Sequence, residues 1–202
     1  MLDTLIEWDV VQQAFKGQEK SGDCCLVKPF ETSVLVVAVD GLGHGNEAAA
    51  AAKIAVDVLE ANACDDLVSL FKQTHEALRQ SRGVVMSMAL INSSDAKMTW
   101  MGVGNVEGLL LRADPDIQPQ KESLLVRPGV LGGSSLSLDA FVIPIMQGDT
   151  LVFATDGIRR GFDEAINSRD PPREISANIM SRYSKESDDA LVLVARYIGI
   201  SP

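Results

Sequence analysis

Apolar residues along the chain gather in short runs that alternate with turn residues. The runs have the length and the β-branched content typical of strands, and Gly, Pro, Asn, Asp and Ser separate them. They lie at Leu5–Val11, Cys24–Val27, Val34–Val39, Val84–Ile91, Met98–Val103, Gly108–Leu111, Leu124–Val126, Ala140–Ile143, Thr150–Ala154 and Ala190–Ile198. The pattern therefore predicts about ten strands.

Helical spacing of apolar residues is found in three further segments. Glu47–Ala61 is rich in alanine, and Asp65–Gln80 repeats leucine at helical spacing, with Asp65 placed to cap its start. Pro172–Arg182 begins with a proline, which is favoured at the first position of a helix. We expect two helices early in the chain and one late.

Short links join several of the predicted strands and favour antiparallel pairing. Asn-Ser-Ser-Asp, Gly-Asn and Gln-Gly-Asp each separate two neighbouring runs, as in hairpins. The expected fold is α+β, with sheet packed on sheet and helices outside. We expect one domain over residues 1–202, with a loose Pro- and Gly-rich surface excursion at Ala113–Ser137.

Charge and composition exclude several classes of protein. The net charge of the 202 residues is −10, and no basic face is available for nucleic acid. No run approaches the ~20 apolar residues of a membrane span, and the N-terminus has acids where a signal peptide has Lys or Arg. Cys24, Cys25 and Cys64 fit neither a disulfide framework nor a zinc site. We expect a cytoplasmic protein.

The stretch Val34–Val56 raises the first question of function. An apolar strand ends in Asp40, and three glycines (Gly41, Gly43, Gly45) lead into an alanine-rich helix. A dinucleotide-binding loop would need a different glycine spacing, and Asp40 would repel a pyrophosphate. A metal ligand on a rigid strand end is a second interpretation, with glycines that let cation and phosphate come close. An ordinary Asp-Gly turn is a third.

The same arrangement returns later in the chain. Asp156-Gly157 ends another apolar strand, and Asp188-Asp189 stands just before the last one. Three carboxylates at strand ends, without neighbouring histidines, suit Mg²⁺ or Mn²⁺ better than zinc.

Taken together, these motifs resemble the metal-dependent serine/threonine protein phosphatases (the PPM family), and most closely its SpoIIE-like and RsbX-like stress-signalling branch. The matching segments, in the order of the family, are Ser21–Asp23, Val39–Gly45, Arg82–Ser87, Gly102–Asn105, Ala154–Gly157 and Asp188-Asp189. They cover the chain from about residue 21 to residue 195. As a set the motifs are specific, although each one alone is weak.

The resemblance implies an αββα sandwich of two antiparallel sheets with two divalent ions, Mn²⁺ or Mg²⁺, in a cleft at the sheet edges. By position, Asp40 would bridge both ions, and the carbonyl of Gly41 would complete one of them. Asp156 and Asp188 would hold the other, and Asp23 would lie near the metals through water.

The resemblance also implies a mechanism in which a hydroxide bridging the two metals attacks phosphorus in line. Many eukaryotic members have a histidine where this chain has Leu42, and His44 lies two residues further on. His44 could protonate the leaving oxygen, bind phosphate, or be an exposed loop residue. His75, between polar neighbours in a helix, is expected at the surface. Asn105 replaces an aspartate of many members, which makes a third ion less favourable.

The predicted function is hydrolysis of phosphoserine or phosphothreonine on a partner protein. By resemblance, that substrate would be a STAS-domain component of a stressosome-type signalling complex. Two alternatives remain open at this stage. One is an inactive phosphatase fold that only binds its partner, and the other is a metal-dependent hydrolase of a small phosphoester.

Overall fold

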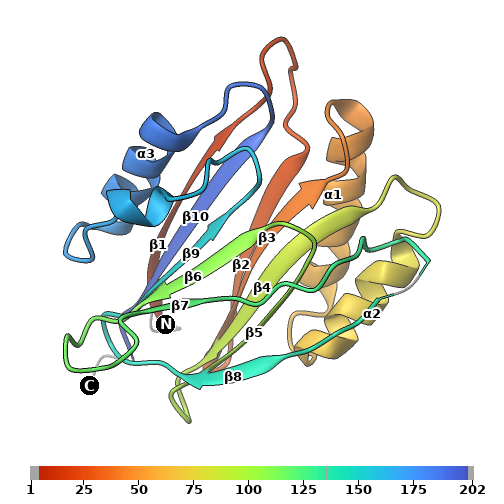
Figure 1. Ribbon diagram of the computed structural model, residues 1–202. Helices are drawn as coiled ribbons and strands as arrows, with labels where there is room; N and C mark the ends of the chain where they lie inside the picture. The colour runs from red at the N-terminus through yellow and green to blue at the C-terminus, as the bar shows by residue number, and fades with distance from the viewer. Residues whose placement is uncertain (1–4, 135, 200–202) are drawn as a thin grey trace.

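The computed structural model describes residues 5–134 and 136–199 and shows ten strands within them (Figure 1). The strands are β1 (Ile6–Gln13), β2 (Asp23–Phe30), β3 (Ser33–Gly41), β4 (Val84–Asn92), β5 (Lys97–Val103), β6 (Glu107–Leu111), β7 (Lys121–Ser123), β8 (Phe141–Pro144), β9 (Thr150–Ala154) and β10 (Ala190–Tyr197). The helices are α1 (Asn46–Ala61), α2 (Leu67–Ala77), the 3₁₀ helix η1 (Phe162–Ala165) and α3 (Pro172–Tyr183).

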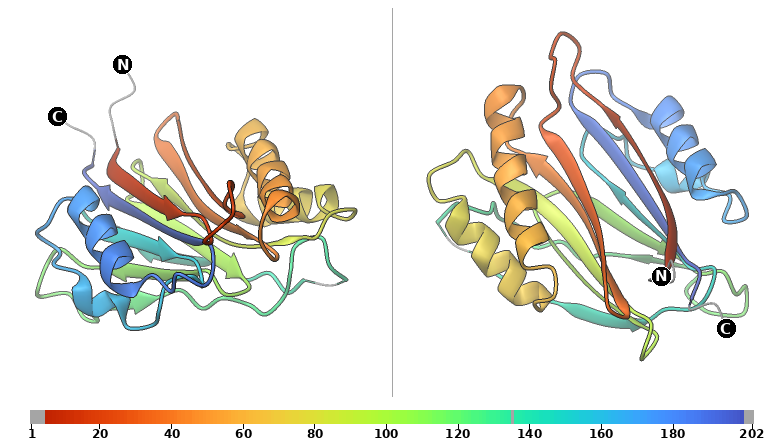
Figure 2. Two further views of the ribbon diagram at one scale, coloured as in Figure 1. Left: turned by 90° about the horizontal axis from the view of Figure 1, so that it is seen from above. Right: turned by 180° about the vertical axis from the view of Figure 1, so that it is seen from behind.

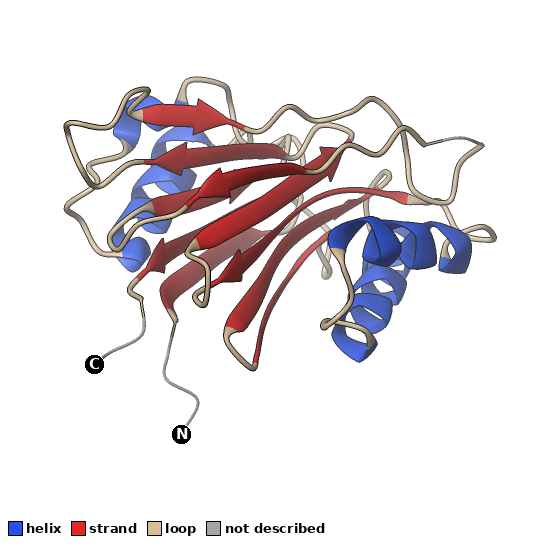
Figure 3. Ribbon diagram, turned by 90° about the horizontal axis from the view of Figure 1, so that it is seen from below, coloured by secondary structure: helices blue, strands red, loops and turns tan. Residues whose placement is uncertain are grey.

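The strands form two five-stranded sheets that pack face to face. One sheet has the order β1-β10-β9-β6-β7, and the other has the order β2-β3-β4-β5-β8. All neighbouring strands in both sheets are antiparallel. Helices α1 and α2 lie outside the second sheet and α3 lies outside the first, as Figures 2 and 3 show. The predicted α+β sandwich is confirmed.

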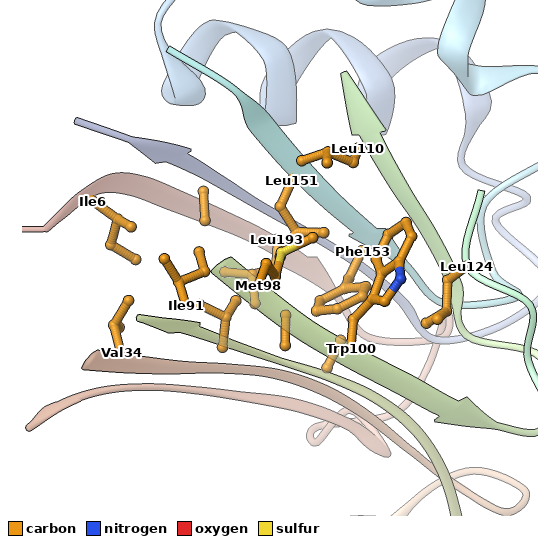
Figure 4. Packing of buried hydrophobic residues seen from close by; sticks show 14 of the residues in the cluster. Ile6, Val34, Ile91, Met98, Trp100, Leu110, Leu124, Leu151, Phe153 and Leu193 are labelled. Carbon is orange, nitrogen blue, oxygen red and sulfur yellow. The ribbon is translucent and has the colours of Figure 1, made fainter. Parts of the chain in front are cut away.

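The central core fills the space between the two sheets (Figure 4). On β3, Val34, Val36 and Ala38 point into this core, and Leu35 and Val37 point outward to the helices. Both faces of the strand are therefore buried. This explains why its sequence is a continuous apolar run instead of an alternating one.

The helices cover the outer faces of the sheets with small or aliphatic residues. Ala51, Ala52 and Ala55 of α1 are buried against the second sheet, where their small side chains let the helix approach closely. Ile175 and Ile179 of α3 pack in the same way on the first sheet. None of the helices in the described ranges is long and apolar enough to cross a membrane.

Two of the three short links do not form the predicted hairpins. Ser93–Ala96 does join the antiparallel pair β4 and β5. Gly104–Val106, however, carries the chain from β5 in one sheet to β6 in the other, and Ile145–Asp149 does the same between β8 and β9. A short link restricts the distance between strand ends, and two packed sheets also bring strand ends that close.

The Pro- and Gly-rich segment Ala113–Ser137 runs over the surface and is attached to the sheets at a few points. Its strand is Lys121–Ser123, three residues before the predicted Leu124–Val126, and it pairs with β6. Leu124 and Leu131 are buried, and Leu131 forms an isolated bridge with Val84 of β4.

Two local predictions on α2 were wrong. The helix is capped by Asp66, whose carboxylate accepts a hydrogen bond from the backbone N–H of Ser69, and not by Asp65. His75 is buried and accepts a hydrogen bond from the N–H of Gly132 at 3.1 Å. Of its polar sequence neighbours, Glu76 is exposed but Thr74 is buried, and Gly132 of the Ala113–Ser137 segment lies against the histidine ring.

A buried ion pair ties the two sheets together at the end of the sandwich near β8. The guanidinium of Arg112 donates to the carboxylate of Asp149 at 2.9 Å and to the carbonyl of Pro144 at 2.8 Å. Asp149 is fully buried and also accepts from the N–H groups of Ala113 and Met146. The pair thus fixes the link that crosses from β8 to β9.

Replacing Asp149 with alanine should destabilise the protein by about 3 kcal/mol or more, because the change leaves Arg112 buried without one partner. Urea unfolding followed by circular dichroism measures the loss. Asp57→Ala is the control, since Asp57 pairs with Lys53 on the exposed surface of α1 and should change stability little. Equal effects of the two substitutions would contradict a structural role for the buried pair.

Candidate metal centre

The candidate site lies where strands of both sheets end at the same edge. Asp40 is the second-last residue of β3, and Asp23, the first residue of β2, is its register partner. Asp156 follows the end of β9, and Asp188 precedes β10, which pairs with β9. In Figure 1 this edge is the upper end of the sandwich, near the start of α1.

An open cleft of about 490 Å³ occupies this edge. Its lining residues are Phe15, Asp40, Leu42, Gly43, His44, Val85, Gly104, Asn105, Asp156, Ser187 and Asp188. Three of them are aspartates and none is Lys or Arg. Of the predicted site residues, Asp40, Asp156, Asp188 and His44 thus share one cleft, whereas Asp23 and Gly41 are buried beside it.

Only glycine fits after Asp40 and Asp156, because any side chain there would clash with nearby backbone. A Cβ on Gly41 would lie 2.2 Å from the carbonyl oxygen of Ala48 in α1. A Cβ on Gly157 would lie 1.9 Å from the carbonyl oxygen of Asp189. One interpretation of the sequence was that Gly41, Gly43 and Gly45 let cation and phosphate come close. In the structure, Gly41 and Gly157 also allow neighbouring backbone to lie against each Asp-Gly turn, which fixes the position of the carboxylate.

Burial and mutual repulsion both favour the protonated form of the inner aspartates. Burial, and then the charges of Asp23, Asp156, Asp188 and Asp189, raise the pKa of Asp40 to about 8. Burial also raises the pKa of Asp23 to about 7, although a 2.7 Å hydrogen bond from the hydroxyl of Thr155 opposes the shift. The surroundings of Asp40 and Asp23 therefore disfavour their ionised forms, and no cationic side chain lines the cleft to offset that charge.

Asp156 is held from two directions at the outer side of the cleft. The side-chain amide of Asn105 donates to its carboxylate at 2.8 Å, and the ammonium of Lys185 contacts its backbone carbonyl. Burial and the charge of Asp188 raise the pKa of Asp156, whereas Lys185 and Asn105 lower it. Asn105, at the position where many family members have aspartate, orients Asp156.

The two adjacent aspartates before β10 have different surroundings. Asp188 lines the cleft. Asp189 is buried, and its carboxylate accepts hydrogen bonds from the N–H groups of Phe15 and Gly22, both at 2.8 Å. This geometry favours Asp188 as the metal ligand of the pair, since both carboxylate oxygens of Asp189 already have partners.

Sequence reasoning missed two residues of the site. Phe15, from the β1–β2 connection, lines the cleft beside His44, and no motif marks it. Thr155 accepts from the N–H of Leu191 at 2.8 Å and donates to Asp23, so it joins β9, β10 and β2. The sequence feature that could have identified Thr155 is its position, as a polar residue at the end of an otherwise apolar strand and directly before Asp156.

The residues present fit hard divalent cations. Within residues 5–134 and 136–199, no three His, Cys, Asp or Glu side chains are grouped so that they alone could hold a metal ion. An open arrangement suits Mg²⁺, which keeps several waters and is usually bound by one or two carboxylates plus substrate phosphate. A bound cation would offset the cost of ionising Asp40 and Asp23, and the carboxylate oxygens are the donors that such ions prefer.

The family model for stage II sporulation protein E (SpoIIE) matches residues 31–198 of the sequence. The chain belongs to the SpoIIE family. The match covers β3 to β10 and therefore contains Asp40, Asp156 and Asp188.

Known relatives of this SpoIIE-family chain agree with that assignment. It is 26% identical over 190 residues to the phosphoserine phosphatase RsbX of Bacillus subtilis (strain 168), covering 92% of this chain and 91% of RsbX. A chain from a structure of the bacterial stressosome superposes with a TM-score of 0.86 and 31% identity, covering 95% of this chain and 99% of that one. A crystal structure of RsbX in complex with magnesium gives a TM-score of 0.84 at 23% identity, covering 95% of each chain.

These findings confirm the predicted membership of the PPM phosphatases. The protein is a serine/threonine protein phosphatase of the metal-dependent PPM type, with the fold of RsbX.

Removing divalent metal from this SpoIIE-family protein should make its stability fall as pH rises from 5 to 8. A free aspartate titrates near pH ~3.9, whereas the folded protein keeps the protons of Asp40 and Asp23 up to about pH 8 and 7. Between these limits the folded state binds more protons than the unfolded state, so higher pH favours unfolding. Urea midpoints measured in EDTA across this range test the prediction.

Asp40→Asn should remove much of this pH dependence, because it deletes the carboxyl with the more strongly raised pKa. Asp57→Asn, on the exposed face of α1, should keep the wild-type dependence. Midpoints that stay level or rise with pH in the wild-type protein would show that folding does not raise the pKa values of Asp40 and Asp23.

Proposed function

We propose that this phosphatase removes phosphate from serine or threonine of a STAS-domain protein in a stressosome-type complex, using two divalent ions, Mg²⁺ or Mn²⁺. The observation that carries the proposal is a surface cleft with three aspartates and no Lys or Arg among its lining residues. A phosphomonoester is a dianion, and this cleft repels it unless cations are bound there.

Asp40, Asp156 and Asp188 are the proposed ligands, with the carbonyl of Gly41 beside them and Asp23 acting through water. When bound, the cations supply the positive charge that offsets the phosphoryl oxygens and acidifies water. Asn105 holds the Asp156 carboxylate in one orientation through its 2.8 Å hydrogen bond. Thr155 does the same for Asp23.

His44 is the proposed general acid. It lies in the exposed turn between β3 and α1 and lines the cleft, so it can exchange protons with water. From this position it can protonate the serine or threonine oxygen as the phosphoester bond breaks.

The proposed substrate is a protein for two reasons. The cleft lies at the edge of the sandwich and is open to solvent, so a phosphorylated loop of another protein can enter it. The relative that is similar over most of both chains is a phosphoserine phosphatase, and a structurally similar chain comes from a stressosome structure. The STAS-domain identity follows from the resemblance of the motifs.

Phosphate release from a phosphoserine-containing STAS-domain protein should require Mn²⁺ or Mg²⁺ and should stop in EDTA. Asp40→Asn should lower kcat/KM at least about 100-fold, because losing an indirect metal partner alone costs 10–100-fold. Malachite-green detection of released phosphate measures both effects. The variant should remain folded by circular dichroism, since it removes a charge that is repelled by its neighbours.

Asp57→Asn is the matched control, an aspartate-to-asparagine change on an exposed helix face, and should retain wild-type turnover. Turnover that survives chelation would eliminate the metal-dependent mechanism. Turnover of small phosphoesters together with inertness toward every phosphoprotein tested would instead identify a small-molecule hydrolase.

A further inference from the structure

The connection between β1 and β2, residues 14–22, is held at both ends by one buried carboxylate. One oxygen of Asp189 accepts from the N–H of Phe15, and the other accepts from the N–H of Gly22. Asp189 is only 3% exposed and stands directly before β10. A single side chain from the last strand thus closes a loop that is more than 160 residues away in sequence.

The same connection also touches the turn that follows Asp40. The ring of Phe15 lies beside the ring of His44, with centroids 5.6 Å apart and planes tilted by 48°. The side-chain oxygen of Gln18 lies 2.9 Å from the position that a Cβ on Gly45 would take. The loop therefore contacts this turn at two points, and Phe15 becomes part of the cleft lining.

We infer that Asp189 is a positioning residue that holds Phe15 at the cleft, where Phe15 contacts the polypeptide flanking the phosphorylated residue. The inference deepens the proposed function and rests on it, because it assumes a protein substrate. Asp188 and Asp189 then have different roles, since Asp188 lines the cleft and Asp189 binds the β1–β2 loop.

The chemistry of Phe15 suits a peptide and not the phosphate group. Its ring has no charge and no hydrogen-bond donor to attract a dianion. Aromatic side chains that are fixed in position contribute strongly to protein recognition, since they bury large area with little loss of conformational entropy. The hydrogen bond from the Phe15 N–H to Asp189 fixes its backbone, the bond from Gly22 fixes the other end of the loop, and the contact with His44 restricts the ring.

Comparing two substrates tests the inference. Phe15→Ala should lower kcat/KM for the phosphorylated STAS-domain protein about tenfold more than for p-nitrophenyl phosphate, and the change should lie mainly in KM. Phe15→Tyr should restore most of the preference, because it keeps the ring. Val142→Ala, which trims an exposed side chain on β8, is the control and should leave the ratio at its wild-type value.

Asp189→Asn tests the positioning role directly. The N–H groups of Phe15 and Gly22 approach different oxygens of Asp189, and asparagine replaces one of these oxygens with an NH₂ group that cannot accept. Hydrogen exchange of these two amides should accelerate in the full-length variant, and the preference for the phosphoprotein should fall as in Phe15→Ala. Unchanged exchange of both amides, or an equal loss on both substrates in the two variants, would overturn the inference.

The outcomes separate this inference from the proposed function. A wild-type protein that hydrolyses p-nitrophenyl phosphate but no phosphoprotein would overturn the proposed substrate and the docking role of Phe15 with it. The exchange measurement uses no substrate and still decides whether Asp189 holds the loop. A wild-type protein active on both substrates, with an unaltered ratio in Phe15→Ala, would overturn the inference alone.

Discussion

Repulsion between buried carboxylates is the constraint on which this structure depends. Two apolar sheets pack so that aspartates from β2, β3 and the ends of β9 and β10 meet at one edge. Burial and mutual repulsion raise the pKa of Asp40 to about 8, so the folded protein holds these groups against their electrostatic preference. The apolar core provides the stabilisation that makes this arrangement possible, and bound cations would relieve it.

The strands and helices could be predicted because most of them are buried on one or both faces. Continuous apolar runs marked β3, β4 and β10, and Pro172 marked the start of α3. The sheet to which each strand belongs could not be predicted. Gly104–Val106 is short enough for a hairpin but crosses to the other sheet, and only the packing of the sandwich determines that.

The candidate site was predictable only where it repeats a local pattern. Asp40 and Asp156 stand in the same strand–Asp–Gly unit, and Asp188 precedes a strand. Phe15 and the role of Asp189 depend on contacts between segments that are distant in sequence, which leave no local pattern. His75 shows the opposite error, because polar neighbours suggested exposure while a later loop covers it.

The order of strands in the first sheet has a consequence for synthesis of the protein. Within the described residues, β10 is the only neighbour of β1 in its sheet, and it separates β1 from β9. Strand β1 therefore has no partner in its sheet until β10, the last of the described strands, has been synthesised. Such long-range pairing slows folding, and it also delays assembly of the cleft, which draws Phe15, Asp40 and Asp188 from both ends of the chain. A growing chain therefore has no complete site, and activity can begin only after Asp188 and β10 have been synthesised.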